Sequence, residues 1–261
     1  MIQRNLQYIL WSFFLLVSCL PASSRGFVQR DTLHPADLTI AYAISVSSPG
    51  KAGVGETYNG GIKTIFVSGD KARMRQASLA RVQSIFLLPQ KNGAARIVIA
   101  KESGTEKYRV NMTAAQWREY NSKYDSARFT LYDDSLVIAG FNCRKGAVTL
   151  QDGRQIEVWF TNEVDNQLFR RADPAFTSVP GIVLQYAYHI KRSSIIYTAT
   201  EVAQLPVDKK VFAVPVTGYQ LKRYIPGRPA EPVSDLLQEE EWEDGDDAVT
   251  DSLQKQQDKK H

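Results

Sequence analysis

The sequence predicts a mainly β protein, built as a single curved antiparallel sheet, an open half-barrel, with one short helix. Three observations predict this class. Large apolar residues alternate with small or polar residues from Leu38 to Val46, which is the period of a strand with one buried face. Runs of similar character recur at steady spacing, separated by turn residues. Only one segment among them starts like a helix, so the sequence disfavours the βαβ alternation of a parallel sheet.

The runs that we expect to form strands follow one another along the chain, and two connections read as hairpins. Asp152-Gly153 lies between two runs and suits a tight hairpin turn. A second hairpin turns at residues 191–194. In the run that starts at Lys71, the charged residues take the outer face. The runs lie at residues 38–46, 62–67, 71–75, 84–88, 96–100, 108–112, 128–132, 136–141, 147–150, 155–161, 182–190 and 195–201.

The one helix expected inside the domain starts after Thr113. Thr113 and Gln116 have the spacing of a capping box, in which each side chain accepts a hydrogen bond from the other residue's backbone N–H. The helix should run to about Asn121. Trp117 and Tyr120 are three residues apart and share a face that can lie against the sheet. We interpret the helix as a packing element rather than as a lid over a cavity.

The start of the chain predicts export. Arg4 precedes an apolar block from Leu6 to Val17, and small residues follow the block. The block has about 12 residues, whereas a helix that crosses the hydrocarbon core of a membrane needs about 20. We therefore expect a cleaved signal peptide rather than a membrane anchor.

Two cleavage sites fit the small residues, and they lead to different mature proteins. Removal of residues 1–24 leaves a soluble protein that begins with a flexible segment, residues 25–35. Removal of residues 1–18 leaves Cys19 as the first residue, where attached acyl chains would form a lipid anchor. The expected location is the periplasm, or the outer membrane if Cys19 is lipidated.

Charge divides the rest of the chain into a β domain, residues 36–225, and a disordered acidic tail, residues 226–261. Residues 235–251 contain nine acidic residues and no Lys or Arg. Since the formal net charge is +4, the remainder of the chain carries +13. The tail has few apolar residues to offset the entropy of ordering, and it can engage an envelope protein partner. Nucleic acid is not an expected partner for an exported protein.

Residues that commonly perform catalysis are few. His34, His189 and His261 have no metal-ligand spacing, so neither a metal nor a cofactor is expected. His189 is expected to face outward from its strand. Cys143 is the one cysteine of the folded part, and we expect a buried, unreactive thiol, because Arg144 points to the opposite face of the strand. The sequence therefore predicts no enzyme.

Three short segments between residues 136 and 190 form an ordered pattern. Its positions are Gly140, Cys143, Lys145, Ala147, Trp159, Thr161, Pro180 and Gly181. In order and spacing the pattern resembles the motifs of the GLPGLI family of exported bacterial envelope proteins. Gly146 is an insertion in the first motif, and Ser178-Val179 replaces the Gly-Leu that opens the signature. The chain resembles a divergent member of this family.

The resemblance implies a periplasmic or surface domain without catalytic residues, similar to the half-barrel of lipoprotein carriers such as LolA and LolB. It also implies a Gram-negative source, in which exported proteins carry O-glycans at Asp-Ser or Asp-Thr followed by a small or aliphatic residue. The positions that fit are Thr32, Ser126, Ser135 and Ser252.

Two functional hypotheses follow. Many strands with one apolar face and a single covering helix leave room for a cavity, so the first hypothesis is a binding module that holds a lipid or acyl chain on the concave face. The alternative is an envelope interaction or scaffolding module with a solid core and no ligand, which engages a partner through its acidic tail or a sheet edge.

Overall fold

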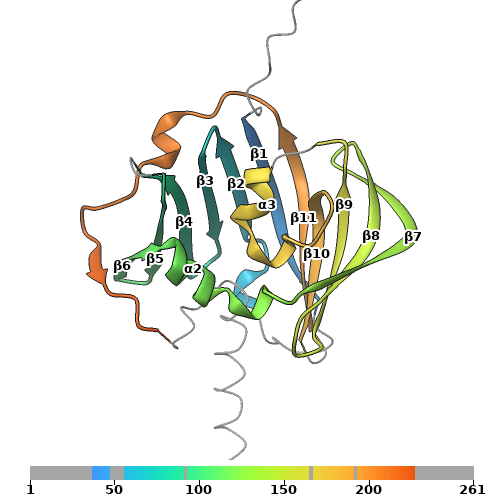
Figure 1. Cartoon of the computed structure of the whole chain (residues 1–261), viewed down its shortest axis with the longest axis horizontal. Coiled ribbons are helices and arrows are strands. Elements are labelled where there is room, and N and C mark those ends of the chain that lie inside the picture. Colours follow the sequence, from blue (N-terminus) through green and yellow to red (C-terminus); the bar gives the residue numbers. More distant parts are fainter. Residues whose placement is uncertain (1–36, 48–55, 91–92, 165–166, 191–192, 227–261) are drawn as a thin grey trace, which may run out of the picture. The chain divides into compact units, whose positions relative to one another are not determined.

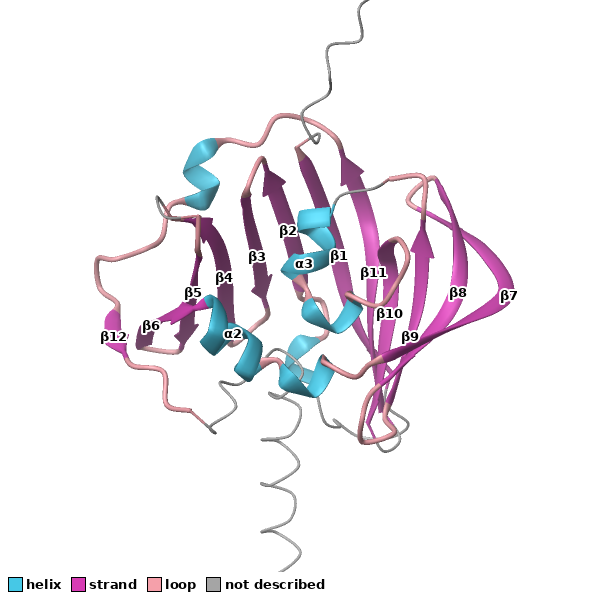
Figure 2. Cartoon of the chain, viewed as in Figure 1, coloured by secondary structure: helices cyan, strands magenta, loops and turns pink. Residues whose placement is uncertain are grey.

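The fold is one open, curved sheet with a few short helices on its concave face (Figures 1 and 2). The computed structural model describes residues 37–47, 56–90, 93–164, 167–190 and 193–226. Within these ranges the sheet has twelve strands, in the order β12-β6-β5-β4-β3-β2-β1-β11-β10-β9-β8-β7. The predicted fold class is confirmed.

Several expected features lie outside the described residues. These are the signal peptide, the segment 25–35, Cys19, Thr32, Ser252 and the acidic tail beyond Pro226. In the part of the chain that is described, no helix has both the length and the apolar character needed to span a membrane.

The elements follow the chain as short strands with brief helical connections. The strands are β1 (Leu38–Ser47), β2 (Ile62–Ser68), β3 (Lys71–Ala77), β4 (Arg81–Pro89), β5 (Ala95–Ser103), β6 (Glu106–Thr113), β7 (Arg128–Ile138), β8 (Phe141–Thr149), β9 (Gln155–Thr161), β10 (Ile182–Ile190), β11 (Ser193–Ala203) and β12 (Gln220–Lys222). The helices are α2 (Ala114–Tyr120) and α3 (Gln167–Ala172), with 3-10 turns η1 (Glu56–Tyr58), η2 (Ser122–Tyr124), η3 (Pro174–Phe176) and η4 (Lys209–Phe212).

β1 is a central strand, and the sheet extends from it in both directions (Figure 1). On one side β1 pairs with β2, and the chain continues to β6 as a meander in which each strand pairs with the next. On the other side β1 pairs with β11, and β7 forms the far edge. All these pairs are antiparallel, while the short β12 runs parallel to β6.

The period-two pattern of the sequence gives each strand one inward face. In β1, Leu38, Ile40, Tyr42 and Ile44 are all buried, and the residues between them are more exposed. β3 alternates in the same way, with its charged residues on the outer face as predicted. The inward side chains of neighbouring strands form one hydrophobic core.

The predicted Asp152-Gly153 turn is confirmed by its hydrogen bond, since Gly153 N donates to Leu150 O at 3.0 Å and Gly153 has φ of 86°. The second predicted hairpin is confirmed by the antiparallel pairing of β10 with β11, although β11 already begins at Ser193 and residues 191–192 are not described. The expectation of separate strands at 128–132 and 136–141 is wrong, because residues 128–138 form the single strand β7 and the chain turns at Ala139 and Gly140, which have positive φ of 48° and 85°. Such a pair is typical of a type I′ hairpin, which matches the twist of the flanking strands.

Helix α2 begins at the predicted capping box. Gln116 N donates to Thr113 Oγ1 at 3.2 Å, and Thr113 N donates to Gln116 Oε1 at 2.9 Å. Trp117 and Tyr120 stack with ring centroids 5.3 Å apart, and Tyr120 is buried. The helix lies over β5 and β6 and forms one wall of a groove, which is more than the simple packing role that we expected.

A second short helix was not expected from the sequence. Between β9 and β10 the chain crosses the concave face as α3 and η3, in front of the central strands (Figure 1). Phe169, Ala172 and Phe176 from this crossing segment are buried in the main core. The segment contacts β2 and β3, so it fills part of the concavity and leaves the rest open.

The convex side of β4 and β5 is also covered. After β11 the chain crosses this side, and Val214 and Tyr219 pack against buried Phe86 and Val98. Arg73 Nη1 donates to Val211 O at 2.9 Å and fixes the same segment. β4 and β5 are therefore buried on both faces.

Candidate functional site

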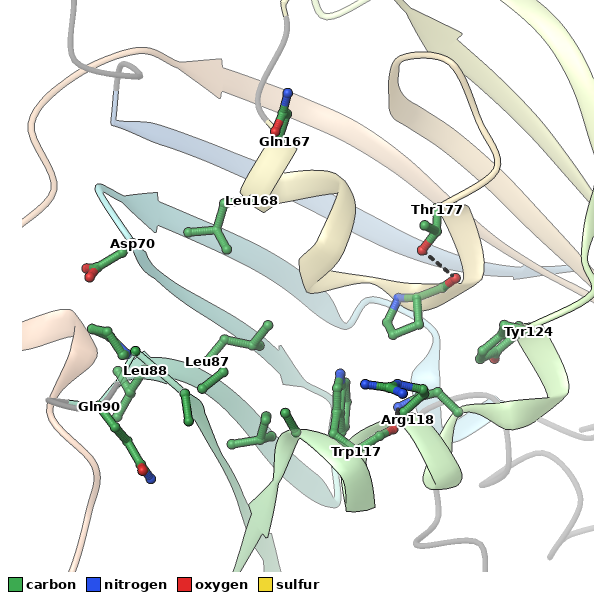
Figure 3. A pocket seen from close by; sticks show the side chains of 18 of the residues that line it. Asp70, Leu87, Leu88, Gln90, Trp117, Arg118, Tyr124, Gln167, Leu168 and Thr177 are labelled. Atoms are coloured by element: carbon green, nitrogen blue, oxygen red, sulfur yellow. Dashed lines mark hydrogen bonds between the residues drawn. The ribbon is translucent and has the colours of Figure 1, made fainter.

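The concave face carries a groove of about 1180 Å³ between α2 and α3 (Figure 3). Leu87 of β4 and Ile97 of β5, which pair across the two strands, form its floor. Trp117 of α2 and Leu168 of α3 form opposite walls, and Pro174 continues the second wall. A groove with this apolar floor and these apolar side chains in its walls can hold a small or chain-like apolar ligand.

Polar side chains lie at the two ends of the groove (Figure 3). Asp70 and Gln90 are at one end. Arg118, Tyr124 and Thr177 are at the other. An amphiphile could therefore lie along the groove with its apolar part on the floor and its polar group at one end.

A buried polar cluster adjoins the Trp117 end of the groove. Trp117, Tyr124 and Pro174 also line a small cavity of about 40 Å³, which reaches this cluster. We call it the tyrosine–lysine cluster, and it consists of Lys63, Asp173, Tyr42, Tyr186, Tyr188 and Tyr197.

Lys63 is the centre of the tyrosine–lysine cluster. Its Nζ lies 2.6 Å from Asp173 Oδ2 and donates to Tyr186 Oη at 2.8 Å, although Lys63 is only 4% exposed. The ring centroids of Tyr42, Tyr186 and Tyr197 lie 5.9, 5.0 and 5.7 Å from the ammonium, within the range of cation–π attraction. Because Asp173 precedes η3, the ion pair holds the crossing segment against β2.

The tyrosines around Lys63 pack closely and stay protonated at neutral pH. Tyr186 stacks on Tyr197 with centroids 4.4 Å apart, and Tyr42 Oη donates to Val183 O at 2.7 Å. Burial raises the pKa of Tyr42, Tyr186 and Tyr197, and the charge of Asp173 raises these pKa values further. The cluster thus presents neutral hydroxyls and one internally paired charge, and the protein's own lysine occupies the aromatic cage.

Side chains suited to covalent or metal chemistry are scattered over the described residues. No three His, Cys, Asp or Glu side chains gather there in a way that could hold a metal ion. His189 is exposed on β10, with Nδ1 2.9 Å from Ser194 Oγ, so it faces outward as predicted. Cys143 is fully buried, and burial raises its pKa to about 11, so the thiol is protonated at neutral pH.

The family-motif positions lie in the β7–β8 turn, on β8 and β9, and directly before β10, and none of them lines the groove. Lys145 and Trp159 are opposite each other on β8 and β9, with Lys145 Nζ 5.6 Å from the Trp159 ring centroid. Lys145 Nζ also lies 3.2 Å from Glu157 Oε2. Gly140 forms the β7–β8 turn, and Ala147 is buried. These positions contribute to the sheet and its turns.

Gly181 and Thr161 form the tightest contact among the motif positions. A Cβ on Gly181 would collide with the carbonyl group of Thr161 and with Asn162 Oδ1. Gly181 starts the strand pairing of β10 with β9, where Ile182 is opposite Thr161. Glycine at this position allows the close approach of the two backbones.

We expect Gly181→Ala to lower the free energy of unfolding by about 1–3 kcal/mol, because the added methyl group has no space between two backbones. Urea unfolding followed by circular dichroism measures the loss. Pro180→Ala is the matched control, since the neighbouring motif residue is exposed. A Gly181→Ala protein within about 0.5 kcal/mol of wild type would contradict the clash.

The predicted glycosylation positions that are described are accessible. Ser126 lies in the turn before β7, and Ser135 lies on β7, both exposed. Accessibility is necessary for modification, and the modification itself stays a prediction.

The residues that matter most for the groove were not identified from the sequence. Lys63 offered one signal: it occupies the inward phase of its strand with Ile65 and Val67, where a charge requires a buried partner. Asp173 and Leu168 lie in the unpredicted crossing segment. Trp117 was predicted on an inward face, and the structure places it in the groove wall.

Comparison with known proteins gives weak structural similarity only. No family model matches the chain, and no curated protein matches it significantly. Two solved structures of PNGF-II, in space groups P21 and C2, are each 18% identical, have TM-scores of 0.40 and 0.39, and cover 72% and 77% of this chain. A crystal structure of MucB is 11% identical, has a TM-score of 0.31 and covers 70% of this chain. The chain spans 32% of each PNGF-II chain and 58% of MucB.

Proposed function

We propose that the chain is a non-catalytic exported envelope protein that holds an apolar ligand, a lipid or acyl chain, in the groove between α2 and α3. The observation that carries the proposal is the groove of about 1180 Å³ with Leu87 and Ile97 as its floor. Export is supported by the N-terminal sequence pattern, and membership of the GLPGLI family by the motif order.

The energetics favour a chain-like ligand. Each CH2 group that leaves water contributes about 0.8 kcal/mol, so about ten buried methylenes, as in an acyl chain, contribute the roughly 8 kcal/mol of micromolar binding. The paired Lys63 and the neutral tyrosines hold the crossing segment in place, so the wall with Leu168 and Pro174 is present before the ligand arrives.

Leu168→Glu is expected to weaken binding of a fluorescent fatty acid about tenfold or more, since a carboxylate in the apolar wall must be desolvated by the ligand. Leu168 is partly exposed, so the protein should still fold. The matched control is Leu205→Glu, because Leu205 is 68% exposed and is not part of the groove. Fluorescence titration measures both variants, with circular dichroism to verify the fold.

Lipid extraction and mass spectrometry of the purified protein provide an independent test. A wild-type chain that copurifies with no lipid and does not bind fatty acids would contradict the proposal.

One observation favours the interaction module as a second candidate. β7 is an edge strand, with an unpaired outer side and with Leu131, Leu136 and Val137 42%, 46% and 63% exposed. Exposed edges of this kind can accept a strand from a partner. Capture of a partner that Val137→Lys abolishes, in a protein without bound lipid, would favour this function.

A further inference from the structure

The convex side of β3 to β6 carries a concentration of positive charge. Antiparallel register places six basic side chains on this side, and we call them the basic face. They are Lys71, Arg73, Arg75, Arg96, Lys107 and Arg109. Glu102 is the one carboxylate that these four strands place on the same side. It accepts a hydrogen bond from Tyr219 Oη, and its Oε2 lies 3.1 Å from Lys107 Nζ.

Two arginines of the basic face have N–H groups that donate to no acceptor within the described residues. Arg75 and Arg109 belong to one row across the sheet, on either side of Ser84 and Ala100, which are both buried; Val214 and Tyr219 pack against the cluster that contains Ala100. In the described ranges neither guanidinium has a hydrogen-bond or ion-pair partner, and Arg109 Nε is buried without one. A guanidinium without a carboxylate partner can form charge-assisted hydrogen bonds to an added carboxylate through its accessible nitrogens.

Exposed apolar side chains lie next to these arginines. Leu221 of β12 is opposite Arg109 in the register and is 59% exposed. Val216, in the segment that leads to β12, is also 59% exposed. The surface therefore suits a partner that combines carboxylates with large apolar residues.

We propose that the acidic segment of this chain, residues 235–251, docks on the basic face. It has nine acidic residues and no basic ones, and it also contains Leu236, Leu237 and Trp242. These are the two kinds of group that the basic face and Leu221 require. The charges complement each other, since the rest of the chain carries a net +13.

The reach of the chain fits this docking. The described chain ends at Pro226, four residues after β12, which is itself the edge of the sheet beside β6. Residues 227–234 can span about 26 Å when extended. Four strand spacings separate β12 from β3, or about 19 Å. The acidic segment can therefore reach Arg109 and Arg75 from its own attachment point.

Docking on the convex side leaves the groove open, because the groove lies on the concave side. The acidic segment would neutralise the basic face, and any other polyanion would have to displace it. Ligand binding in the groove is expected to be unchanged when the acidic segment is released.

A spin label on the acidic segment tests the proposal in the full mature chain. Ala248→Cys provides the labelling site in a Cys19→Ser background, and buried Cys143 stays unlabelled. At an ionic strength of about 0.01 M, we expect paramagnetic broadening of the backbone amide signals of Arg75 and Arg109. At about 1 M the Debye length falls to about 3 Å, and the broadening should disappear.

Charge variants separate docking from chance proximity. Arg75→Gln with Arg109→Gln should abolish the broadening, and so should a fourfold tail variant that leaves the folded domain unchanged. That variant is Glu239→Gln, Glu240→Gln, Glu241→Gln and Glu243→Gln. Arg128→Gln with Arg144→Gln, on the exposed β7 and β8, is the control that should retain it.

Absence of broadening at low salt, or equal loss in the control, would overturn the proposal. A combination of two results with phosphatidylglycerol vesicles would also overturn it. The vesicles would bind the wild type and the fourfold tail variant equally, and the double variant Arg75→Gln with Arg109→Gln would not bind them. The basic face would then belong to a membrane surface.

Discussion

Lys63→Met is expected to lower the free energy of unfolding by about 3–5 kcal/mol, the largest effect of any single substitution that we predict. The substitution removes the ammonium that lies 2.6 Å from Asp173 and leaves a carboxylate with little access to water. It also removes the donor to Tyr186 Oη and the cation at the centre of three tyrosine rings. Methionine has a similar length, so a cavity contributes little to the loss.

A double-mutant cycle shows whether the loss comes from the unpaired carboxylate. Asp173→Leu removes the charge, and the double variant should recover most of the stability, since an apolar pair in place of a buried ion pair is often close to neutral. Equilibrium urea unfolding of the four proteins measures the coupling. A Lys63→Met protein that loses less than about 1 kcal/mol would show that the pair is solvated in solution.

The same pair links stability to ligand binding. Asp173 lies between α3 and η3, and this crossing segment provides Leu168 and Pro174 to the groove. Loss of the ion pair should therefore loosen the groove wall and weaken fatty-acid binding as well. Leu168→Glu should weaken fatty-acid binding without a comparable loss of stability. This difference separates Leu168, which lines the groove, from Lys63 and Asp173, which fix the position of the crossing segment.

Much of the sheet could be predicted because its signals are local. Alternation from Leu38 to Val46 specifies a strand and its inward face without knowledge of its neighbours. The capping box of Thr113 and Gln116 likewise depends on four consecutive residues. Asp152-Gly153 specifies a hairpin through the φ preference of glycine.

The functional features depend on contacts between distant parts of the chain. Lys63 and Asp173 are 110 residues apart, and neither local segment shows that a buried partner exists. α3 is only six residues long, too short for its sequence to specify a helix without the core beneath it. The apolar run from Ser84 to Leu88 did contain a clue, because a strand that is apolar on both faces must be covered on both. The segment with Val214 and Tyr219 provides that second cover.

Alkaline pH is expected to unfold the protein steeply, within about two pH units above 10. Burial raises the pKa of the four cluster tyrosines, Tyr42, Tyr186, Tyr188 and Tyr197, above the ordinary tyrosine value of about 10. A group whose pKa is raised in the folded state stabilises that state fully below its unfolded pKa. Above that pKa the unfolded chain releases protons that the folded chain retains, so stability falls as pH rises.

The slope follows from the number of buried hydroxyls. Each contributes about 1.4 kcal/mol per pH unit, so the four together contribute about 5–6 kcal/mol per pH unit until the folded groups also titrate. A typical domain has a total stability of about 5–15 kcal/mol, which this slope removes quickly. Cys143, with its pKa raised to about 11, acts in the same direction at slightly lower pH.

Urea unfolding at a series of pH values from about 8 to 11.5 measures this slope, since it spans the ordinary tyrosine pKa. Tyr197→Phe removes one of the four hydroxyls at the expense of a long hydrogen bond to Gln76 Oε1 at 3.4 Å, so the slope above pH 10 should fall by about a quarter. Tyr132→Phe, at an exposed position on β7, should leave the slope unchanged. An equal slope in Tyr197→Phe and wild type would mean that the cluster opens to water before it ionises, and that the crossing segment is released first.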